Sequence, residues 1–410
     1  MELAARAPFC NNRLSFLSRG THCDFLMPRR RSNLIRNLLI VVVLAIMFLM
    51  GVAPLLEPLF PVTPEVSVWL GWIRSHVMEV LITLWFFVFG SMVGSFINVV
   101  VWRMPRGISV VSSGSACPYC EVPIRLADNI PVFGWLKLRG RCRVCRLPIS
   151  PRYPIVEGVF GLVFLLMFLV ELQSAGANLP WNRRYLSTGI LRVVLSPNWE
   201  LIYIYAYHML LLVMLLTWVL MAFDRSRIPL KTIVFAWLLG LAAPVAFPVL
   251  YPVPWHFVLP DQTLGLLWSE ALVTGILGWT LGMGLGLILQ IWFNKYPDQA
   301  NNSRATAFCF ATTGLFMGWQ FIILTIAVFG LLVLVKQIFA YANRVPISCW
   351  VTLSVIVVLC TWKYLQVTGS LTDAWPYWVV LLVIGLLLSR VGASLEMPIP
   401  NEGSQQMVSE

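Results

Sequence analysis

Long apolar stretches recur along most of this 410-residue chain, and no other feature restricts its fold as strongly. Each stretch is at least ~18 residues long, which is the length that an α-helix needs to cross a bilayer. They lie at residues 37–56, 80–101, 154–171, 201–223, 230–250, 271–293, 307–335, 347–366 and 376–395. The seventh stretch is long enough to be one tilted helix or two pieces broken near Gly318. The pattern therefore predicts eight to ten transmembrane helices.

The composition excludes a water-soluble globule. Hydrophobic residues make up 59% of the chain and charged residues 11%, against roughly 45–50% and about 25% in soluble proteins. The predicted fold class is therefore an all-α polytopic membrane protein with a small zinc-ribbon-like loop domain. Basic residues outnumber acidic ones by 29 to 18. We relate this excess to membrane orientation and not to nucleic acid, because Lys and Arg collect in cytoplasmic loops.

The loop at 102–153 is the largest polar segment and the most basic. It carries nine basic and two acidic residues, so the positive-inside rule places it in the cytoplasm. Residues 1–36 are also Arg-rich and lack the apolar region of a signal peptide, so we expect a cytoplasmic tail there. Two predicted crossings separate the tail from the loop, and the two assignments agree.

Four of the nine cysteines form two close pairs within this loop. The pairs are Cys117/Cys120 and Cys142/Cys145, with 21 residues between them. Two sulfurs on one tight turn cover one edge of a tetrahedral ion and the second turn closes the other, so the spacing predicts a structural zinc site. Arg143 and neighbouring arginines are expected to stabilise the thiolates. Two disulfides or unligated thiols are the alternatives, and a cytoplasmic loop disfavours disulfides.

Further motifs surround the cysteine pairs. They are GSMVGSFINVVVWRMP at 90–105, CPYC at 117–120, DNIPVFGWL at 128–136, LRGRC at 138–142 and PISPRYPIVE at 148–157. In these runs the chain resembles the bacterial prepilin peptidases. These are polytopic inner-membrane aspartic proteases that cut and N-methylate type IV prepilins and type II secretion pseudopilins. A weaker resemblance continues at Gly314, 318–320 and 343–346.

The resemblance implies a division of the chain, a location and a set of partners. We expect a basic tail at 1–36, an extra transmembrane helix and outer loop at 37–78, the family's N-terminal domain at 79–172, a peptidase-like bundle at 173–395 and a polar tail at 396–410. The location implied is the bacterial inner membrane. The partners implied are the lipid bilayer and a pilin-like substrate with a short basic leader before an apolar helix. S-adenosylmethionine is implied as methyl donor by resemblance alone, because the chain has no glycine-rich nucleotide motif.

A family peptidase needs two aspartates, one to activate water and one to polarise the scissile carbonyl. Counting from Pro229 puts Ala222 at the first family position. Thr306 stands at the second, where the family motif Gly-x-Gly-Asp is missing. Asp224 and Asp298 are the only acidic residues on the two corresponding turns, and the sequence thus offers them as the candidate catalytic residues.

Two interpretations of these aspartates stay open. They can form a displaced catalytic pair if the second loop is rebuilt. Alternatively, Asp224 forms a surface ion pair with Arg225 or Arg227 and Asp298 pairs with Lys295. Such exposed pairs need no catalytic role.

Gly94, Asn98 and Arg103 are candidates for the substrate or methyl-donor region. Gly94 belongs to a small-residue face suited to close helix contact. Asn98 and Arg103 fall near the cytoplasmic boundary, where they can bind substrate, cap the helix end or snorkel.

Two other patterns are interpreted as structural. Gly278, Gly282 and Gly286 recur every four residues, which is typical of a helix that lets a neighbour pack closely. The histidines, His208 among them, show no ligand spacing.

These observations leave three hypotheses within the family. The first is a peptidase and methyltransferase with a rearranged aspartate pair. The second is an inactive relative that binds pilin-like segments or assembly partners, and the third is a methyltransferase without proteolysis. A transporter ranks last, because the helix middles carry almost no ionisable residues.

Overall fold

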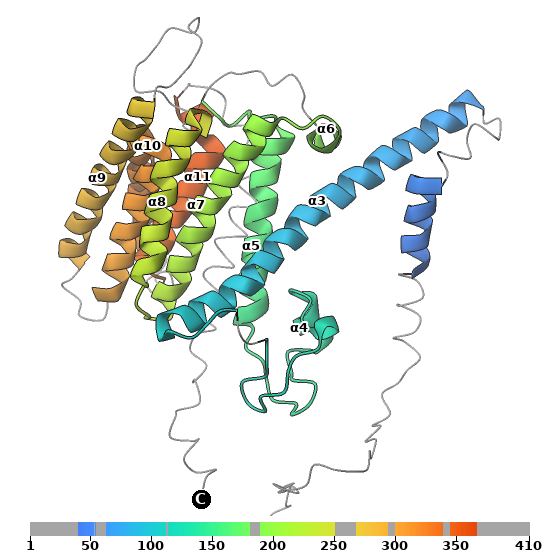
Figure 1. The fold of residues 1–410 in the computed structure, drawn as a ribbon, viewed down its shortest axis with the longest axis horizontal. Coiled ribbons are helices and arrows are strands. Elements are labelled where there is room, and N and C mark those ends of the chain that lie inside the picture. Colours follow the sequence, from blue (N-terminus) through green and yellow to red (C-terminus); the bar gives the residue numbers. More distant parts are fainter. Residues whose placement is uncertain are drawn as a thin grey trace, which may run out of the picture. The chain divides into compact units, whose positions relative to one another are not determined.

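The computed structural model describes residues 40–52, 54, 63–111, 114–180, 189–250, 268–293, 300–338 and 345–366. Over these ranges the chain is mostly helical, and the β-structure consists of isolated bridges without a sheet (Figure 1). Contacts divide the chain into two units, Met1–Val77 and Met78–Glu410.

The residues that the structure describes in the first unit form two helical pieces. Ile40–Val52 is a short apolar helix that ends in the π-helix η1 (Phe48–Val52). Helix α3 (Pro64–Arg103) begins in this unit and continues into the next. The segment expected to be an outer loop is therefore helical from Pro64 onward. Trp69 and Trp72 are exposed on it, as expected of an aromatic belt.

The fold class is confirmed as an all-α polytopic membrane protein. Five helices among the described residues are long and apolar enough to cross a membrane: Pro64–Arg106, Arg152–Gln173, Trp199–Phe223, Ala271–Leu289 and Arg304–Val333. Three shorter apolar helices are Ile40–Val52, Leu230–Ala246 and Ile347–Lys363. Eight of the nine predicted stretches coincide with these helices. The ninth, 376–395, lies outside the described residues.

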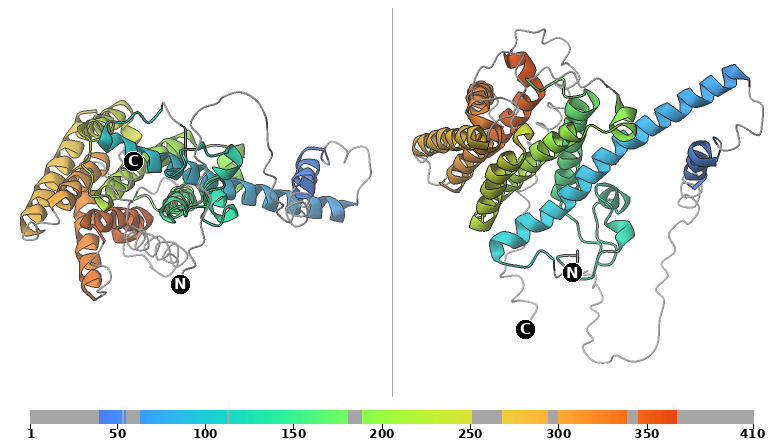
Figure 2. Two further views of the ribbon diagram at one scale, coloured as in Figure 1. Left: turned by 90° about the horizontal axis from the view of Figure 1, so that it is seen from below. Right: turned by 45° about the horizontal axis from the view of Figure 1, so that its top comes forward.

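The second unit is a bundle of long helices with a small loop domain at one end. Its helices are α5 (Arg152–Met167) with the π-helix η4 (Phe168–Gln173), α6 (Ile190–Leu195), α7 (Trp199–Phe223), α8 (Leu230–Ala246), α9 (Trp268–Phe293), α10 (Ala300–Ile338) and α11 (Ile347–Gln366). The long helices of the bundle run roughly parallel in Figure 1, and α10 contacts both α9 and α11. Figure 2 shows the same bundle from two further directions. Short 3-10 turns are η2 (Met104–Arg106), η3 (Leu126–Asp128) and η5 (Pro248–Leu250), and the loop domain adds the short helix α4 (Phe133–Lys137).

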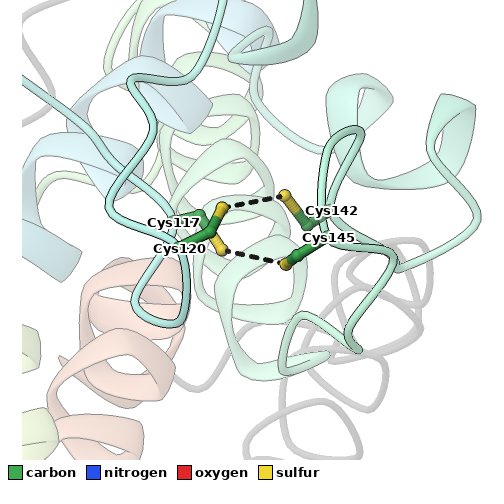
Figure 3. A group of neighbouring side chains, drawn as sticks. All are labelled: Cys117, Cys120, Cys142 and Cys145. Carbon is green, nitrogen blue, oxygen red and sulfur yellow. Dashed lines mark hydrogen bonds between the residues drawn. The ribbon is translucent and has the colours of Figure 1, made fainter. Parts of the chain in front are cut away.

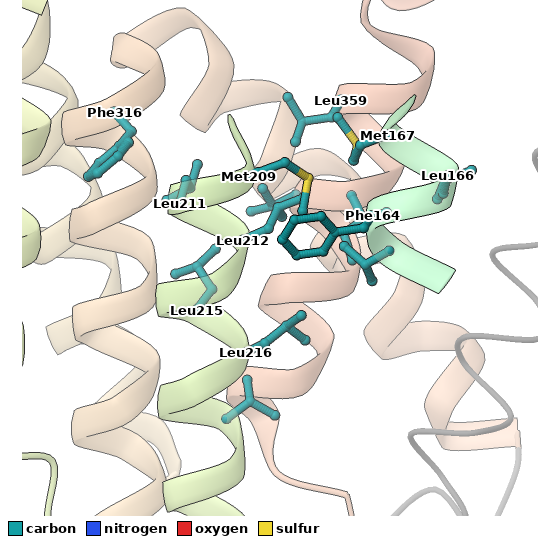
Figure 4. Packing of buried hydrophobic residues seen from close by; sticks show 14 of the residues in the cluster. Phe164, Leu166, Met167, Met209, Leu211, Leu212, Leu215, Leu216, Phe316 and Leu359 are labelled. Carbon is teal, nitrogen blue, oxygen red and sulfur yellow. The ribbon is translucent and has the colours of Figure 1, made fainter. Parts of the chain in front are cut away.

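Helix α7 lies in the middle of the buried core and contacts α5, η4, α10 and α11. Leu211, Leu212 and Leu215 are fully buried on it (Figure 4). The Tyr207 ring stacks on Phe316 of α10 with centroids 4.7 Å apart. Because lipid tails are as apolar as these side chains, close packing holds such helices together more than burial from water does.

Helices α9 and α10 approach each other through glycine. A Cβ atom added at Gly278 would lie 2.0 Å from the carbonyl oxygen of Gly314, and one at Gly282 would lie 2.3 Å from that of Phe310. The glycine repeat is therefore a packing face, as predicted. Helix α10 is also broken at Gly318, where φ is 82° and ψ is 175°. Of the two alternatives for this stretch, the structure has the one with a break at Gly318.

Candidate functional site

The first cysteine pair lies on a tight turn closed by three backbone hydrogen bonds. The amide of Cys117 donates to Val122 O (3.1 Å), and that of Glu121 donates to Cys117 O (2.9 Å). Ile124 N donates to Ser115 O (2.9 Å). Glu121 has a positive φ of 56°, so the chain reverses sharply after the second cysteine.

The second pair repeats this turn 25 positions later. Cys142 N donates to Leu147 O (2.9 Å), Arg146 N donates to Cys142 O (3.1 Å) and Ile149 N donates to Gly140 O (2.7 Å). Arg146 has a φ of 62°. The internal repeat seen in the sequence is thus a repeat of backbone geometry, with two equivalent turns that each present two sulfur atoms.

The two turns bring all four sulfur atoms within 4.8 Å of one another (Figure 3). The Sγ atoms of Cys117 and Cys145 are 3.8 Å apart, and those of Cys120 and Cys142 are 3.9 Å apart. Sulfurs about 2.3 Å from a tetrahedral zinc ion are ~3.8 Å apart. The cluster therefore has the dimensions of a closed four-thiolate site. All four cysteines are free thiols, so the structure does not contain the alternative disulfides.

The local backbone favours a thiolate at the cluster. The amides of Cys145 and Val144 point at the Cys142 sulfur and lower the pKa of its thiol to about 6. Val144 N lies 3.4 Å from that sulfur. Because the thiolate is the metal-binding form of cysteine, the turn prepares this ligand before any ion binds.

Arg143 has a different partner from the thiolates predicted for it. Its guanidinium binds the buried carboxylate of Asp128 through two hydrogen bonds of 2.6 Å. Lys137 adds a contact of 3.3 Å. Hydrogen bonds from Arg143 hold the pKa of the Asp128 carboxyl below its usual range. This ion cluster fixes the second cysteine turn to the η3 segment.

The predicted substrate region lies where the loop domain joins the membrane helices. Asn98 Nδ2 donates to Tyr153 O (3.4 Å), and Arg103 donates to the carbonyls of Ser109 (3.5 Å) and Gly114 (3.3 Å). A Cβ atom at Gly94 would lie 2.9 Å from Phe160 Cβ on α5. These contacts favour the capping and packing interpretation, and a substrate role for the three residues stays a prediction.

Asp224 has a partner that the sequence did not indicate. It forms a bidentate ion pair with Arg152, with N–O distances of 2.5 and 2.7 Å. Arg152 begins α5, so the pair ties the end of the loop domain to the turn after α7. Ala222 and Thr306 are both buried. Asp298 lies outside the described residues.

A second polar pair, inside the bundle, escaped the sequence analysis. His208 Nδ1 on α7 lies 2.5 Å from Glu171 Oε1 on η4, and both side chains are fully buried. Glu171 Oε2 and His208 Nε2 have no hydrogen-bond partner. His208 is therefore not a lone histidine, and a buried pair that joins η4 to α7 agrees with the structural role expected for it. The signal available was one acidic and one imidazole side chain, each inside an apolar stretch.

The fold and the site together define a polytopic helical membrane protein with a four-cysteine loop domain between two membrane helices. Residues 88–170 match the family model described as the bacterial peptidase A24 N-terminal domain. This part of the chain is thus similar to the N-terminal domain of prepilin peptidases.

Three curated relatives illustrate the range of similarity. The type 4 prepilin-like proteins leader peptide-processing enzyme of Escherichia coli is 42% identical over 22% of this chain and 39% of its own length. The prepilin leader peptidase/N-methyltransferase of Myxococcus xanthus is 49% identical over 20% of this chain and 25% of its own length. That of Aeromonas hydrophila is 29% identical over 57% of this chain and 72% of its own length.

The high identities thus come from short alignments, and the chain covers well under half of the first two relatives. The similarity that extends farther is weaker. No solved structure matches the chain.

Proposed function

We propose that this protein recognises prepilin-like membrane precursors, which have a short basic leader before an apolar helix. The observation that carries the proposal is the retained N-terminal domain, whose two cysteine turns keep the same hydrogen bonds. The relatives that share this domain are named for leader processing and N-methylation. We assign the domain to 79–172 and a membrane bundle to 173–395.

Zinc is the metal that fits the cysteine cluster best. Four thiolates at tetrahedral spacing leave no coordination position for substrate, so the ion would hold the two turns together and take no part in chemistry. Removal of the ion is expected to unfold the loop domain, because binding energy and folding energy are linked at such sites.

The loop domain is assigned to the cytoplasmic side of a bacterial inner membrane. Nine basic residues stand against two acidic ones at 102–153, and basic loops stay on the cytoplasmic side. A leader with a basic segment is retained on the same side by the same rule, so substrate and loop domain meet there.

The peptidase centre is proposed to be catalytically inactive. The two positions that correspond to the family's catalytic aspartates hold Ala222 and Thr306. Neither Ala nor Thr can share a proton with a second carboxylate. The Asp224 carboxylate is bound by Nη1 and Nη2, the two terminal nitrogens of the Arg152 guanidinium. A carboxylate fixed in a bidentate ion pair is a poor base, because the pair must break before it takes a proton.

Methyl transfer is a second candidate function. The observation that favours it is that the strongest similarity covers the domain which the resemblance links to N-methylation with S-adenosylmethionine, while the peptidase positions have changed.

The test reconstitutes the full chain in membranes with a prepilin-like precursor from the same genome and follows the precursor's N-terminus by mass spectrometry. An active relative serves as positive control. We expect an intact leader with this protein and a removed leader with the control. Leader removal by this protein that is lost in Asp224→Ala or Asp298→Ala would contradict an inactive centre and establish a displaced aspartate pair.

A second arm supplies a precursor that has already been cut, with and without S-adenosylmethionine. A mass increase of one methyl group that requires the donor would establish methyl transfer. An unchanged mass would leave recognition without chemistry.

A further inference from the structure

The short helix α4 is held against a membrane helix by an unusual turn. Val132, which precedes it, has φ 61° and ψ −55°, a conformation that a β-branched residue adopts only when its surroundings impose it. The amide of Val132 donates to Glu157 Oε2 of α5 at 2.6 Å. Glu157 is buried, so this hydrogen bond fixes the position of α4 along α5.

The position of Glu157 along its membrane span indicates how deep α4 lies relative to the bilayer surface. It is the sixth residue of α5, which belongs to the membrane span Arg152–Gln173. Five helical rises place it ~7.5 Å from the start of the helix. The headgroup layer on each side of a bilayer is roughly 5–7 Å thick. Figure 1 shows α4 beside the end of α5, with the rest of the loop domain extending beyond it.

Large apolar side chains are exposed at this depth. Ile130 is 52% exposed, Phe133 56% and Leu136 55%. Phe133 and Leu136 are three residues apart, which places them on one side of the short helix. In water such a group is costly, whereas at a bilayer interface its apolar side chains can enter the boundary between headgroups and acyl chains.

The charge of the segment indicates what its exposed apolar side chains contact. Arg139, two residues after the end of α4, is exposed, and the loop domain as a whole is strongly basic. Apolar side chains combined with cations at this level match the interface of a bilayer that contains anionic lipid.

We propose that residues 130–139, the α4 anchor, insert their apolar side chains into the bilayer interface and bind anionic lipid headgroups through Arg139. The anchor would keep the four-cysteine loop domain against the membrane surface. This inference is independent of whether precursors are processed.

The test places the photo-cross-linking amino acid benzoylphenylalanine at position 133 or 136 of the full chain. The matched control is position 144, because Val144 on the second cysteine turn is 60% exposed and outside the anchor. Each variant is reconstituted in nanodiscs of phosphatidylcholine with and without phosphatidylglycerol. Adducts are identified by mass spectrometry after irradiation, and only variants with full metal content are compared.

We expect lipid adducts at positions 133 and 136 at roughly ten times the yield at 144, since the control side chain faces water. In mixed nanodiscs phosphatidylglycerol should be enriched among the adducts, and Arg139→Gln should reduce the enrichment roughly fivefold. Equal lipid yields at 133 and 144 would overturn the proposal. Cross-links to protein in place of lipid at 133 would also overturn it.

Discussion

The fully buried pair of Glu171 and His208 permits a quantitative test of the fold. The two side chains join η4 to α7 through one contact of 2.5 Å. They lie inside a span where no water competes for them, and each already has one polar atom without a partner. Changing His208→Phe fills the volume of the ring but leaves the Glu171 carboxylate alone.

The expected loss in the free energy of unfolding depends on the group that stays buried after its partner is removed. Removing one partner of a buried hydrogen-bonded pair costs about 1–3 kcal/mol, and about 3–5 kcal/mol where both groups are charged, because the other group stays buried and unpaired. Replacing both groups with apolar residues of similar size is close to neutral or stabilising. We therefore expect Glu171→Leu and His208→Phe each to destabilise strongly, and the double variant to recover most of that loss.

The assay is reversible unfolding of the four proteins of this cycle in detergent micelles, with Glu65→Leu as a control. Glu65 is exposed in the first turn of α3, so its removal should change the free energy of unfolding by less than ~0.5 kcal/mol. The buried pair would be refuted if each single variant lowered the free energy of unfolding by less than about 1 kcal/mol and the double variant showed the sum of the two effects.

Three further predictions follow from the loop domain and the helix contacts. Cys145→Ser should abolish stoichiometric zinc in elemental analysis and expose the loop to protease, and retained zinc would contradict a four-thiolate site. Gly278→Ala should lower the thermal midpoint, because its Cβ would lie 2.0 Å from Gly314 O; an unchanged midpoint would contradict the close contact. Because the pKa of Asp128 is lowered in the folded chain, its contact with Arg143 should stabilise the loop above the normal carboxyl pKa and be lost as pH falls below it. Asp128→Asn should remove that acid dependence of hydrogen exchange in the loop.

The local parts of the site were predictable because short-range spacing determines them. Two cysteines three positions apart, followed by Pro and Ile in both copies, require a tight turn, and the two turns have matching hydrogen bonds. The glycine repeat at 278–286 likewise indicated a helix contact before the partner, Gly314, was known. Both features depend on residues that are close in the chain.

The parts that escaped prediction join distant residues. Asp224 pairs with Arg152 across 72 positions, and Arg225 or Arg227 were nearer in sequence. Glu171 meets His208 across 37 positions, and the π-helix that carries Glu171 changes the face on which it lies. A single sequence gives the periodicity of each helix but not the rotation of one helix against another.

The central claim is that the protein recognises precursors with a basic leader. The most direct test measures equilibrium binding of a full-length prepilin-like precursor to the nanodisc-embedded chain, against the same precursor without its leader. The account predicts tighter binding of the precursor with its leader, and loss of that difference in Cys142→Ser, which disrupts the metal site. Equal binding of both precursors, or no binding of either, would contradict it.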